Sequence, residues 1–410
     1  MAEKSCVIIG ASHAGVSLAL QLRKEGWTGA IRLIGVEPEL PYHRPPLSKD
    51  FLSGAKTLDG IALRPRKSFE DNAIELLLGH EAVAINPAAH SVQLQDGSEM
   101  PYSQLALCTG SRVRRLPEAE RFANVFYIRT AADVARLSAQ LAPGKRALII
   151  GAGYIGLEAA AVLVKQQLDV TVLEMADRIL QRVTGPILSA YLEAVHTAAG
   201  VHLHTATGIK AIEGGTNAEY VICTDGNRHA ADLLIIGIGI EPETRLAAAA
   251  GLEVEQGIVV DSHARTSDLC IFAAGDCTRH PSLLYGISLR LESVQNATDQ
   301  ARVAAANMAG KAIQYDAVPW FWSDQYTVKL QTAGIHSGYD NVVVRGDATD
   351  PASAGFALFY RLGERLLAVD CVNRPKEFMV SKQLLKLGAQ PVAASLRDES
   401  QEPASWLQTF

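Results

Sequence analysis

Two glycine-rich turns have the composition of dinucleotide-binding sites. The first reads Gly10-Ala-Ser-His-Ala-Gly15 and the second reads Gly151-Ala-Gly-Tyr-Ile-Gly156. Each follows a short apolar run and precedes an alanine-rich segment, which is the strand–turn–helix context in which a diphosphate approaches a helix N-terminus. One such turn is a weak signal. Two turns predict a protein that holds two dinucleotides at once, and the usual purpose of that arrangement is electron transfer between them.

Each turn is followed, about twenty residues later, by a glutamate at the end of the next predicted strand. Glu37 follows a strand expected at 31–34, and Glu174 follows one expected at 170–173. A carboxylate at this spacing accepts hydrogen bonds from the hydroxyls of an adenosine ribose. The second turn has all three glycines. The first has Ser12 in the middle position, which slightly crowds the approach to the pyrophosphate but adds a hydroxyl donor.

Composition and charge favour an enzyme of two or three domains. The 410 residues are 48% hydrophobic and carry a net charge of −6, a balance that favours neither nucleic-acid nor anionic-membrane binding. The first predicted strand begins close to Met1 and leaves no room for a signal peptide. The apolar segment 147–164 divides into a strand, a turn and a helix and does not predict a membrane span. We therefore expect a cytoplasmic protein.

The cysteines have no spacing typical of a metal or iron–sulfur site. They are Cys6, Cys108, Cys223, Cys270, Cys277 and Cys371, and no CxxC pair occurs among them. Cys270 and Cys277 are close enough in sequence to suggest a disulfide, but a cytosolic setting disfavours one. We expect no metal site, and electron transfer without a dithiol relay.

Three further strings resemble a known family of flavoproteins. They are Pro41-Tyr-His-Arg-Pro-Pro-Leu-Ser-Lys49, Gly275-Asp-Cys277 and Pro319-Trp-Phe-Trp-Ser-Asp-Gln325. With the two turns, they resemble the FAD-dependent ferredoxin reductases, the family of putidaredoxin reductase and of the reductase components of biphenyl-type aromatic-ring dioxygenase systems. The resemblance extends from Ser5 to about Glu377. It implies an α/β fold like that of glutathione reductase, with two dinucleotide-binding domains and a C-terminal α+β domain.

One position within this resemblance bears directly on the chemistry. In related disulfide reductases and NADH peroxidases, a reactive cysteine follows a Leu-Ser pair at the place where this chain has Lys49. This difference favours a reductase of external one-electron carriers. Glu158, on the inner face of the helix after the second turn, is expected to pair with Lys49, because a buried carboxylate without a partner is costly. We predict that Lys49 and Glu158 are the catalytic residues, which orient the nicotinamide beside the flavin.

The resemblance implies a resident FAD. Its pyrophosphate would lie on the first turn, and Arg44 and Lys49 would bring positive charge beside the pyrophosphate and the isoalloxazine. The family often has an aspartate where this chain has Val36, and commonly a tryptophan where it has Val294. The residues expected to bind FAD are Gly10, Ser12, His13, Ala14, Gly15, Glu37, Arg44, Pro45, Lys49, Ala82, Thr109, Gly110, Arg129, Gly275, Asp276, Val294 and Trp322.

The second nucleotide is expected to be an exchanging NADH. Glu174 favours NADH over NADPH because a carboxylate repels a 2′-phosphate, although Arg178 and Arg182 are arginines of the kind that can receive that phosphate. The residues expected to bind NADH are Gly151, Gly153, Tyr154, Ile155, Gly156, Glu158, Glu174, Arg182, Gly239 and Glu292.

The implied reaction is hydride transfer from NADH to FAD, followed by single-electron transfer to a [2Fe–2S] ferredoxin. That ferredoxin would supply an oxygenase of the ring-dioxygenase or P450 type. Trp322 is expected to cover the flavin edge at which the ferredoxin docks. A basic docking surface is expected, with a solvated charged face as the alternative for each member: Arg290, Arg374, Lys376, Lys382 and Lys386. We expect a monomer or a weak homodimer.

The order of the motifs predicts an inserted domain. Residues 1–113 and 241–318 are expected to form the FAD domain, 114–240 the NADH domain, and 319–410 the C-terminal α+β domain. The tail after Gln390 is rich in proline, serine and glutamate, and it is expected to pack poorly.

Two other functions are compatible with the same fold. An NADH oxidase or peroxidase is disfavoured because Lys49 stands in place of the reactive cysteine. A flavoprotein resembling apoptosis-inducing factor, in which NADH changes the oligomeric state, is disfavoured because the chain has neither a basic tail nor a long insertion.

Overall fold

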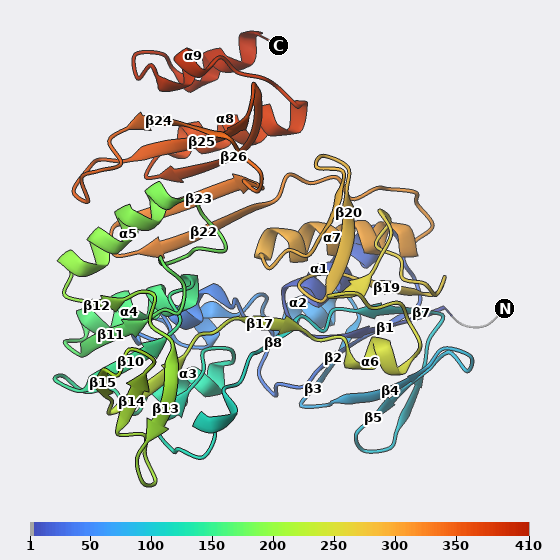
Figure 1. Ribbon diagram of the computed structural model, residues 1–410. Helices are drawn as coiled ribbons and strands as arrows, with labels where there is room; N and C mark the ends of the chain where they lie inside the picture. Colours follow the sequence, from blue (N-terminus) through green and yellow to red (C-terminus); the bar gives the residue numbers. More distant parts are fainter. Residues whose placement is uncertain (1–3, 410) are drawn as a thin grey trace. The chain divides into compact units, whose positions relative to one another are not determined.

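The computed structural model describes residues 4–409, and the chain divides into two compact units (Figure 1). The first unit contains the residues up to 43, 58–112 and 241–319. The second contains 44–57, 113–240 and the residues from 320 onward. The chain passes between the units after residues 43, 57, 112, 240 and 319. The passages after 112 and 240 lie within two short strands, β8 (Ser111–Val113) and β17 (Ile240–Pro242). The second unit therefore combines the segment expected to bind NADH with the C-terminal segment.

A parallel sheet with the strand order β19-β7-β1-β2-β3 forms the core of the first unit. Successive residues of its strands point to opposite faces, and both faces are buried: Ile8 and Leu33 belong to one apolar cluster, Val7 and Ile34 to the other. Burial on both faces explains why these strands read as continuous apolar runs. The strands are β1 (Ser5–Ile9), β2 (Ala30–Gly35), β3 (Ile74–Leu78), β7 (Gln104–Leu107) and β19 (Ile271–Ala273).

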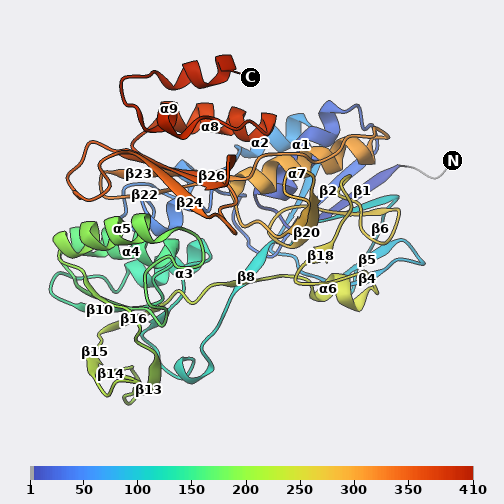
Figure 2. The same cartoon turned by 45° about the horizontal axis from the view of Figure 1, so that its top comes forward.

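Helices α1 (His13–Lys24) and α7 (Val294–Met308) lie side by side in both views of the chain (Figure 1 and Figure 2). Small residues such as Ala14 and Ala301 at this contact let the helices approach closely. Ser293 caps α7 by accepting a hydrogen bond from Asn296 N. The remaining elements are η2 (Asp59–Ile61), α2 (Arg66–Asp71), β4 (Ala82–Asn86), β5 (Ser91–Leu94), β6 (Glu99–Pro101), α6 (Arg245–Ala249), β18 (Ile258–Val259), β20 (Thr278–Ser282) and β21 (Ile287–Leu289).

The second unit contains another parallel sheet, with the strand order β12-β11-β10-β16-β9. Its inner strands β10 and β16 are apolar and stabilise the sheet by burial, since Leu148 and Leu234 are fully buried. The strands are β9 (Val125–Phe126), β10 (Arg146–Ile150), β11 (Asp169–Leu173), β12 (His202–His204) and β16 (Leu233–Ile236). The other elements are η1 (Pro45–Ser48), η3 (Pro117–Ala119), α3 (Ala131–Ser138), α4 (Tyr154–Lys165), α5 (Pro186–Ala198), β13 (Ile209–Glu213), β14 (Tyr220–Cys223) and β15 (Arg228–Ala230).

The C-terminal part of the second unit is an antiparallel sheet with the order β22-β23-β26-β25-β24. Phe356, Phe359 and Val369 on its central strands are fully buried. Its elements are β22 (Trp320–Gln325), β23 (Val328–Gly334), β24 (Asn341–Gly346), β25 (Phe356–Leu362), β26 (Arg365–Val372), α8 (Pro375–Leu387), α9 (Ala393–Arg397) and η4 (Pro403–Thr409).

The C-terminal tail is well packed, so the expectation of a poorly packed end was wrong. The guanidinium of Arg345 donates hydrogen bonds to the carbonyls of Asp398, at 2.5 Å, and Gln401, at 2.8 Å, and is paired with the carboxylate of Glu377 at 3.1 Å. Trp406 is 3% exposed and meets the ring of Phe359 edge-on. The buried guanidinium of Arg345 and the ring of Trp406 therefore anchor a tail whose composition suggested poor packing.

A buried carboxyl group joins the C-terminal sheet to the loop before α5. Asp370 Oδ2, on β26, accepts hydrogen bonds from Thr184 Oγ1 at 2.6 Å and from the hydroxyl of Tyr360 at 2.7 Å. The same tyrosine hydroxyl accepts a hydrogen bond from Gly185 N at 3.3 Å. Burial raises the pKa of Asp370 to about 6, against the opposing effect of the two hydroxyl donors.

Asp370 is expected to make the stability of the protein fall as the pH rises through about 4 to 6. Because its folded pKa lies above the unfolded value, the folded protein keeps a proton that the unfolded chain releases, and this contribution is lost above the folded pKa. A shift of about two units corresponds to about 3 kcal/mol. Asp370→Asn removes this titration. In urea unfolding, the free energy of unfolding of the variant relative to that of the wild type is expected to rise by about 2–3 kcal/mol from pH 4 to pH 7. A difference that does not change with pH would contradict the assignment.

Candidate functional site

The first glycine turn joins β1 to α1 within the first unit. Gly10 has a φ of +114°, and a Cβ there would lie 2.0 Å from the carbonyl oxygen of Cys108. A Cβ on Gly15 would lie 2.0 Å from the carbonyl oxygen of Gly10. Both positions require glycine because strand, turn and helix approach so closely. Ser12 is the N-cap of α1, and its side chain makes no capping hydrogen bond.

The structure places the Gly-Asp string beside this turn. Gly275 has a φ of +92°, and a Cβ there would lie 3.2 Å from the Cβ of Ala14. The next residue, Asp276, accepts a hydrogen bond from Ser111 Oγ at 3.1 Å. Segments far apart in the sequence are therefore brought together at the start of α1. His13, also predicted for this site, is buried there and contacts the ring of His43 edge-on.

The other predicted FAD residues of the first unit are more dispersed. The carboxylate of Glu37 accepts a hydrogen bond from the Tyr42 hydroxyl. Thr109 Oγ1 donates to the carbonyl of Glu243 at 2.6 Å, and Gly110 follows it with a φ of +66°. Ala82 begins β4 and Val294 begins α7.

The donor set of this turn fits a dinucleotide. The first turn of α1, all of which the structure describes, contains no acidic residue, so the positive end of the helix is available to an anion. Glu37 lies just beyond the end of β2, where its carboxylate can accept hydrogen bonds from ribose hydroxyls.

The second glycine turn, in the second unit, is built like the first but has open space at its middle glycine. Gly151 has a φ of +102°, and a Cβ there would lie 2.4 Å from the carbonyl oxygen of Gly237; a Cβ on Gly156 would lie 2.3 Å from the carbonyl oxygen of Gly151. Gly153 is different, because no atom of the described chain lies within 4 Å of the position that its Cβ would take. The outer glycines therefore serve packing, and the middle one leaves open space at the N-terminus of α4. A pyrophosphate fits that space.

Glu174 is fixed against the second turn. Its Oε2 accepts a hydrogen bond from Ala152 N at 2.7 Å and its Oε1 accepts one from Ala176 N at 2.8 Å. These bonds hold the carboxylate beside the turn, and each oxygen keeps a lone pair for a ribose hydroxyl. Gly239 and Arg182, both predicted to bind NADH, lie close to each other, since a Cβ on Gly239 would be 3.8 Å from Arg182 Nη2.

Lys49 and Glu158 form the ion pair that the sequence predicted. Lys49 Nζ lies 2.8 Å from Glu158 Oε1, and their side chains are 17% and 2% exposed. The Pro45-Pro46 pair begins η1, which ends at Ser48 and leaves Lys49 as its C-cap. Glu158 projects from α4, which packs against η1 and β22. The pair therefore depends on three elements of the second unit.

Two serines complete the shell of Glu158, and sequence reasoning missed both. Ser48 Oγ donates to Glu158 Oε2 at 2.5 Å, and Ser323 Oγ donates to Glu158 Oε1 at 2.6 Å. Each serine lies inside a string that carries the family resemblance. The signal that could have found them is the requirement that a buried carboxylate receive several donors.

The remaining predicted residues of the second unit lie in two places, one at the contact of Arg44 with Arg129 and the other among the aromatic side chains of β22 and the start of α4. Arg44 Nη1 donates to the backbone carbonyl of Arg129 at 2.8 Å. On β22, the ring of Phe321 is 4.7 Å from the ring of Tyr154, and the next residue, Trp322, lies beside Trp320 with 5.6 Å between ring centroids. Ile155, the neighbour of Tyr154 on α4, is half-exposed.

Most of the predicted docking residues already have charged or aromatic partners. Arg374 pairs with Glu399 at 2.7 Å, and Lys376 with Glu402 at 3.2 Å. Lys382 Nζ lies 4.7 Å from the centroid of the Trp320 ring. In the first unit, Arg290 pairs with Glu292, which places a predicted NADH residue against a predicted docking residue. Lys386 is exposed in the last turn of α8.

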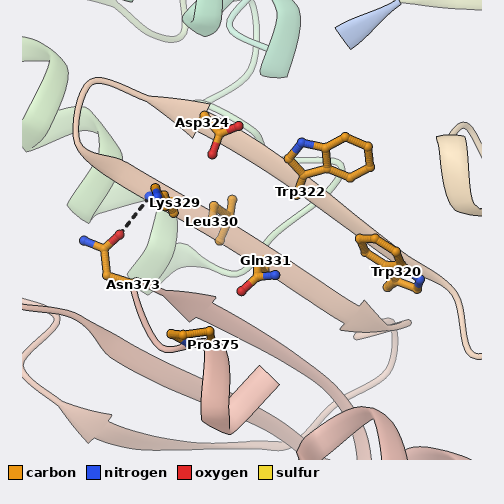
Figure 3. Close-up of a pocket in the computed structure, with 8 residues that line it drawn as sticks. All are labelled: Trp320, Trp322, Asp324, Lys329, Leu330, Gln331, Asn373 and Pro375. Carbon is orange, nitrogen blue, oxygen red and sulfur yellow. Dashed lines mark hydrogen bonds between the residues drawn. The ribbon is translucent and has the colours of Figure 1, made fainter. Parts of the chain in front are cut away.

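A pocket of about 670 Å³ opens on β22 and β23 of the second unit (Figure 3). The two indoles of Trp320 and Trp322 lie along one side, and Asn373 accepts a hydrogen bond from Lys329 N on the other. The lining consists of Trp320, Trp322, Asp324, Lys329, Leu330, Gln331, Asn373 and Pro375.

Residues 4–409 contain neither a candidate metal site nor a candidate membrane-spanning helix. No group of three or more histidine, cysteine, aspartate or glutamate side chains in that range is arranged to hold a metal ion. None of the helices there combines the length and the apolar character needed to traverse a bilayer. The six cysteines are unpaired thiols.

Two family models match most of the chain. The family model described as pyridine nucleotide-disulphide oxidoreductase matches residues 4–301, and the model described as reductase C-terminal matches 320–405. Putidaredoxin reductase of Pseudomonas putida is 45% identical over 94% of this chain and 92% of its own. The ferredoxin–NAD(+) reductase component of the anthranilate 1,2-dioxygenase system of Burkholderia cepacia is 39% identical over the full length of both chains.

A solved structure is similar over nearly the whole length. The reductase chain of the covalent putidaredoxin reductase–putidaredoxin complex superposes with a TM-score of 0.96 and is 43% identical. The match covers 100% of this chain and 99% of that one.

Removing the cation from the buried pair is expected to destabilise the protein. Lys49→Met leaves the carboxylate of Glu158 without a counter-charge, although two hydroxyl donors remain, so we expect a loss of about 2–3 kcal/mol in the free energy of unfolding. Lys56→Met is the matched control, since Lys56 and Asp50 form an exposed pair in the same segment, and its effect should stay below about 0.5 kcal/mol. Urea unfolding measures both, and equal effects would contradict the structural importance of the buried pair.

Proposed function

Because the chain belongs to the pyridine nucleotide-disulphide oxidoreductase family and carries its reductase C-terminal domain, we propose that it is an NADH-dependent reductase of a [2Fe–2S] ferredoxin. The ferredoxin would serve an oxygenase of the ring-dioxygenase or P450 type. The observation that carries the proposal is the buried Lys49–Glu158 pair, at the position where thiol-dependent relatives have a reactive cysteine. The names of the two relatives, both reductases that act in electron transfer, support the same conclusion.

Two nucleotides have separate places in this proposal. The resident FAD is assigned to the turn at 10–15 and to Glu37, Gly275 and Asp276 of the first unit. The exchanging NADH is assigned to the turn at 151–156 and to Glu174 of the second. FAD and NADH bound at these places would supply hydride uptake from the nicotinamide by the flavin and one-electron release to the iron–sulfur partner.

The chain's own contribution at the reacting groups is orientation and charge. Glu158, held by Ser48 and Ser323, fixes the ammonium group of Lys49. A fixed cation and a fixed carboxylate can hold a carboxamide in one orientation and favour negative charge on a nearby ring. No proton has to leave either side chain for this. The pair therefore acts by preorganisation, in the position where a thiol would act by covalent chemistry.

The two cysteines near the first turn, Cys108 and Cys277, are poorly suited to replace the reactive cysteine of thiol-dependent relatives. Burial raises the pKa of the Cys108 and Cys277 thiols, and both side chains are almost wholly enclosed. Thiols of this kind react slowly because little thiolate is present. This disfavours the NADH oxidase or peroxidase alternative.

Anaerobic mixing of the FAD-loaded protein with NADH is expected to bleach the flavin absorbance within milliseconds to seconds, and addition of an oxidised [2Fe–2S] ferredoxin is expected to restore it. NADPH should reduce the flavin more slowly, because the carboxylate of Glu174 repels a 2′-phosphate. Flavin that stays oxidised would overturn the proposal. A long-lived complex with NADH together with a shift from monomer to dimer would instead support a nucleotide-responsive protein that resembles apoptosis-inducing factor.

We place the docking surface for the ferredoxin around the pocket that Trp320, Trp322 and Lys329 line (Figure 3). The aromatic side chains give the apolar centre, and the exposed amine of Lys329 brings positive charge beside the carboxylate of Asp324. The exposed amine of Lys386, in the last turn of α8, is proposed as a second positive position. The ion pairs of Arg374 and Lys376 with glutamates reduce the charge that these two residues offer to a partner. An acidic ferredoxin has the complementary chemistry.

Ferredoxin-dependent turnover is therefore expected to decrease with ionic strength, while reduction of a small dye by NADH stays nearly constant. Lys329→Gln and Lys386→Gln should each weaken the salt dependence and raise the apparent KM for ferredoxin by about three- to tenfold. Lys56→Gln, remote in sequence and exposed, is the charge-matched control. A flat response to salt in the unmodified protein would remove the docking surface from the proposal.

A further inference from the structure

A line of buried polar side chains extends from Glu158 through the interior of the second unit. Ser323 Oγ lies 3.1 Å from Gln325 Nε2, and Gln325 Oε1 lies 2.7 Å from His196 Nε2. His196 Nδ1 in turn lies 3.2 Å from the hydroxyl of Tyr326, whose ring is half-buried. Ser323 and Gln325 lie on β22, and Tyr326 directly follows that strand. His196 lies on α5 and Glu158 on α4.

The hydrogen bonds of this line all run in one direction. Ser323 donates its hydroxyl hydrogen to Glu158, so it must accept from the amide nitrogen of Gln325. The amide oxygen of Gln325 then accepts from His196 Nε2–H, and His196 Nδ1 accepts from the hydroxyl of Tyr326. Burial lowers the pKa of His196, which favours the neutral imidazole with a single N–H. Every donor therefore points toward the carboxylate of Glu158.

The polar groups of this line are deeply buried, and their burial is costly unless each has a hydrogen-bond partner. Ser323 and His196 are 0% exposed and Gln325 is 2% exposed. Burying such groups is tolerated only because each has its partners, and an apolar core would have filled the same space without that requirement. Dipoles aligned in one direction strengthen one another and stabilise the negative charge at the end of the line. The line therefore holds both the charge and the orientation of Glu158.

We propose that His196 and Gln325 are positioning residues, which act through Ser323 to fix Glu158 and, through Glu158, the ammonium group of Lys49. The proposal rests on the function proposed above, in which the Lys49–Glu158 pair orients the nicotinamide. The line is not a path for protons, because the amide of Gln325 interrupts it. Its effect is on geometry and charge at a site that His196 itself does not touch.

A pair of substitutions at one position tests this. His196→Leu removes the N–H that Gln325 accepts, whereas His196→Gln keeps an N–H donor of similar reach. We expect His196→Leu to slow hydride transfer from NADH to the bound flavin by about five- to tenfold in anaerobic stopped-flow measurements, as the loss of a donor to a charged network implies. The dissociation constant of NADH should change by less than about twofold, and His196→Gln should restore most of the rate.

A second readout does not depend on activity. In the absence of NADH, the rate at which an amine-acylating reagent modifies Lys49, measured by mass spectrometry relative to the exposed Lys56, is expected to rise in His196→Leu and in Glu158→Gln. His196→Gln should behave like the wild type. A general loosening of the fold would increase labelling of other half-buried lysines as well, so the half-buried Lys145 is compared in the same digest.

The double variant separates positioning from a merely structural role. In a Glu158→Gln background, His196→Leu should slow hydride transfer no further, because the line then ends on a neutral group. An additional, independent loss would overturn the proposal, as would wild-type rate and labelling in His196→Leu. If NADH fails to reduce the flavin of the wild type, the proposed function fails; the labelling comparison still decides whether the line positions Lys49.

Discussion

The carboxylate of Glu158 is the constraint on which the second unit depends. It is 3% exposed, and a buried charge must be surrounded by a counter-charge and by donors. Lys49 supplies the charge from the turn after η1, Ser48 supplies a hydroxyl from η1 itself, and Ser323 supplies another from β22. Satisfying this one group therefore requires a proline-bracketed turn, helix α4 and the first strand of the C-terminal sheet to meet.

The two glycine turns show how little of a binding site needs side chains. In both turns the outer glycines are required because a Cβ would collide with a backbone carbonyl oxygen, and the helix that follows presents its N-terminal amides. The turns differ in the middle residue. Ser12 stands in that position in the first turn, whereas Gly153 leaves open space in the second.

The family to which the chain belongs is named after disulfide chemistry, yet this member holds an ion pair at the relevant position. Folds of this kind host several reactions, and the site decides which of them occurs. A thiol offers a covalent intermediate and two electrons together. A fixed ammonium–carboxylate pair offers only orientation and an electrostatic field. These suit a flavin that transfers its electrons to a one-electron carrier.

The sequence by itself determined the features that are local. The two turns, the strands around them and the expected pairing of Lys49 with Glu158 could be predicted, because each depends on residue types at short spacing or on the electrostatic need of one buried carboxylate. The fold class was implied by the family resemblance that these motifs carry. The packing of the tail could not be predicted, since it depends on Arg345, which binds backbone carbonyls of residues far along the chain and leaves no pattern in composition. The line from Ser323 through Gln325 to His196 was also invisible, because strand β22 and helix α5 are separated by more than a hundred residues and only the folded core brings their polar atoms within hydrogen-bonding distance. Hydrogen bonds between distant segments are satisfied in three dimensions, so the tertiary structure alone decided which groups surround Glu158.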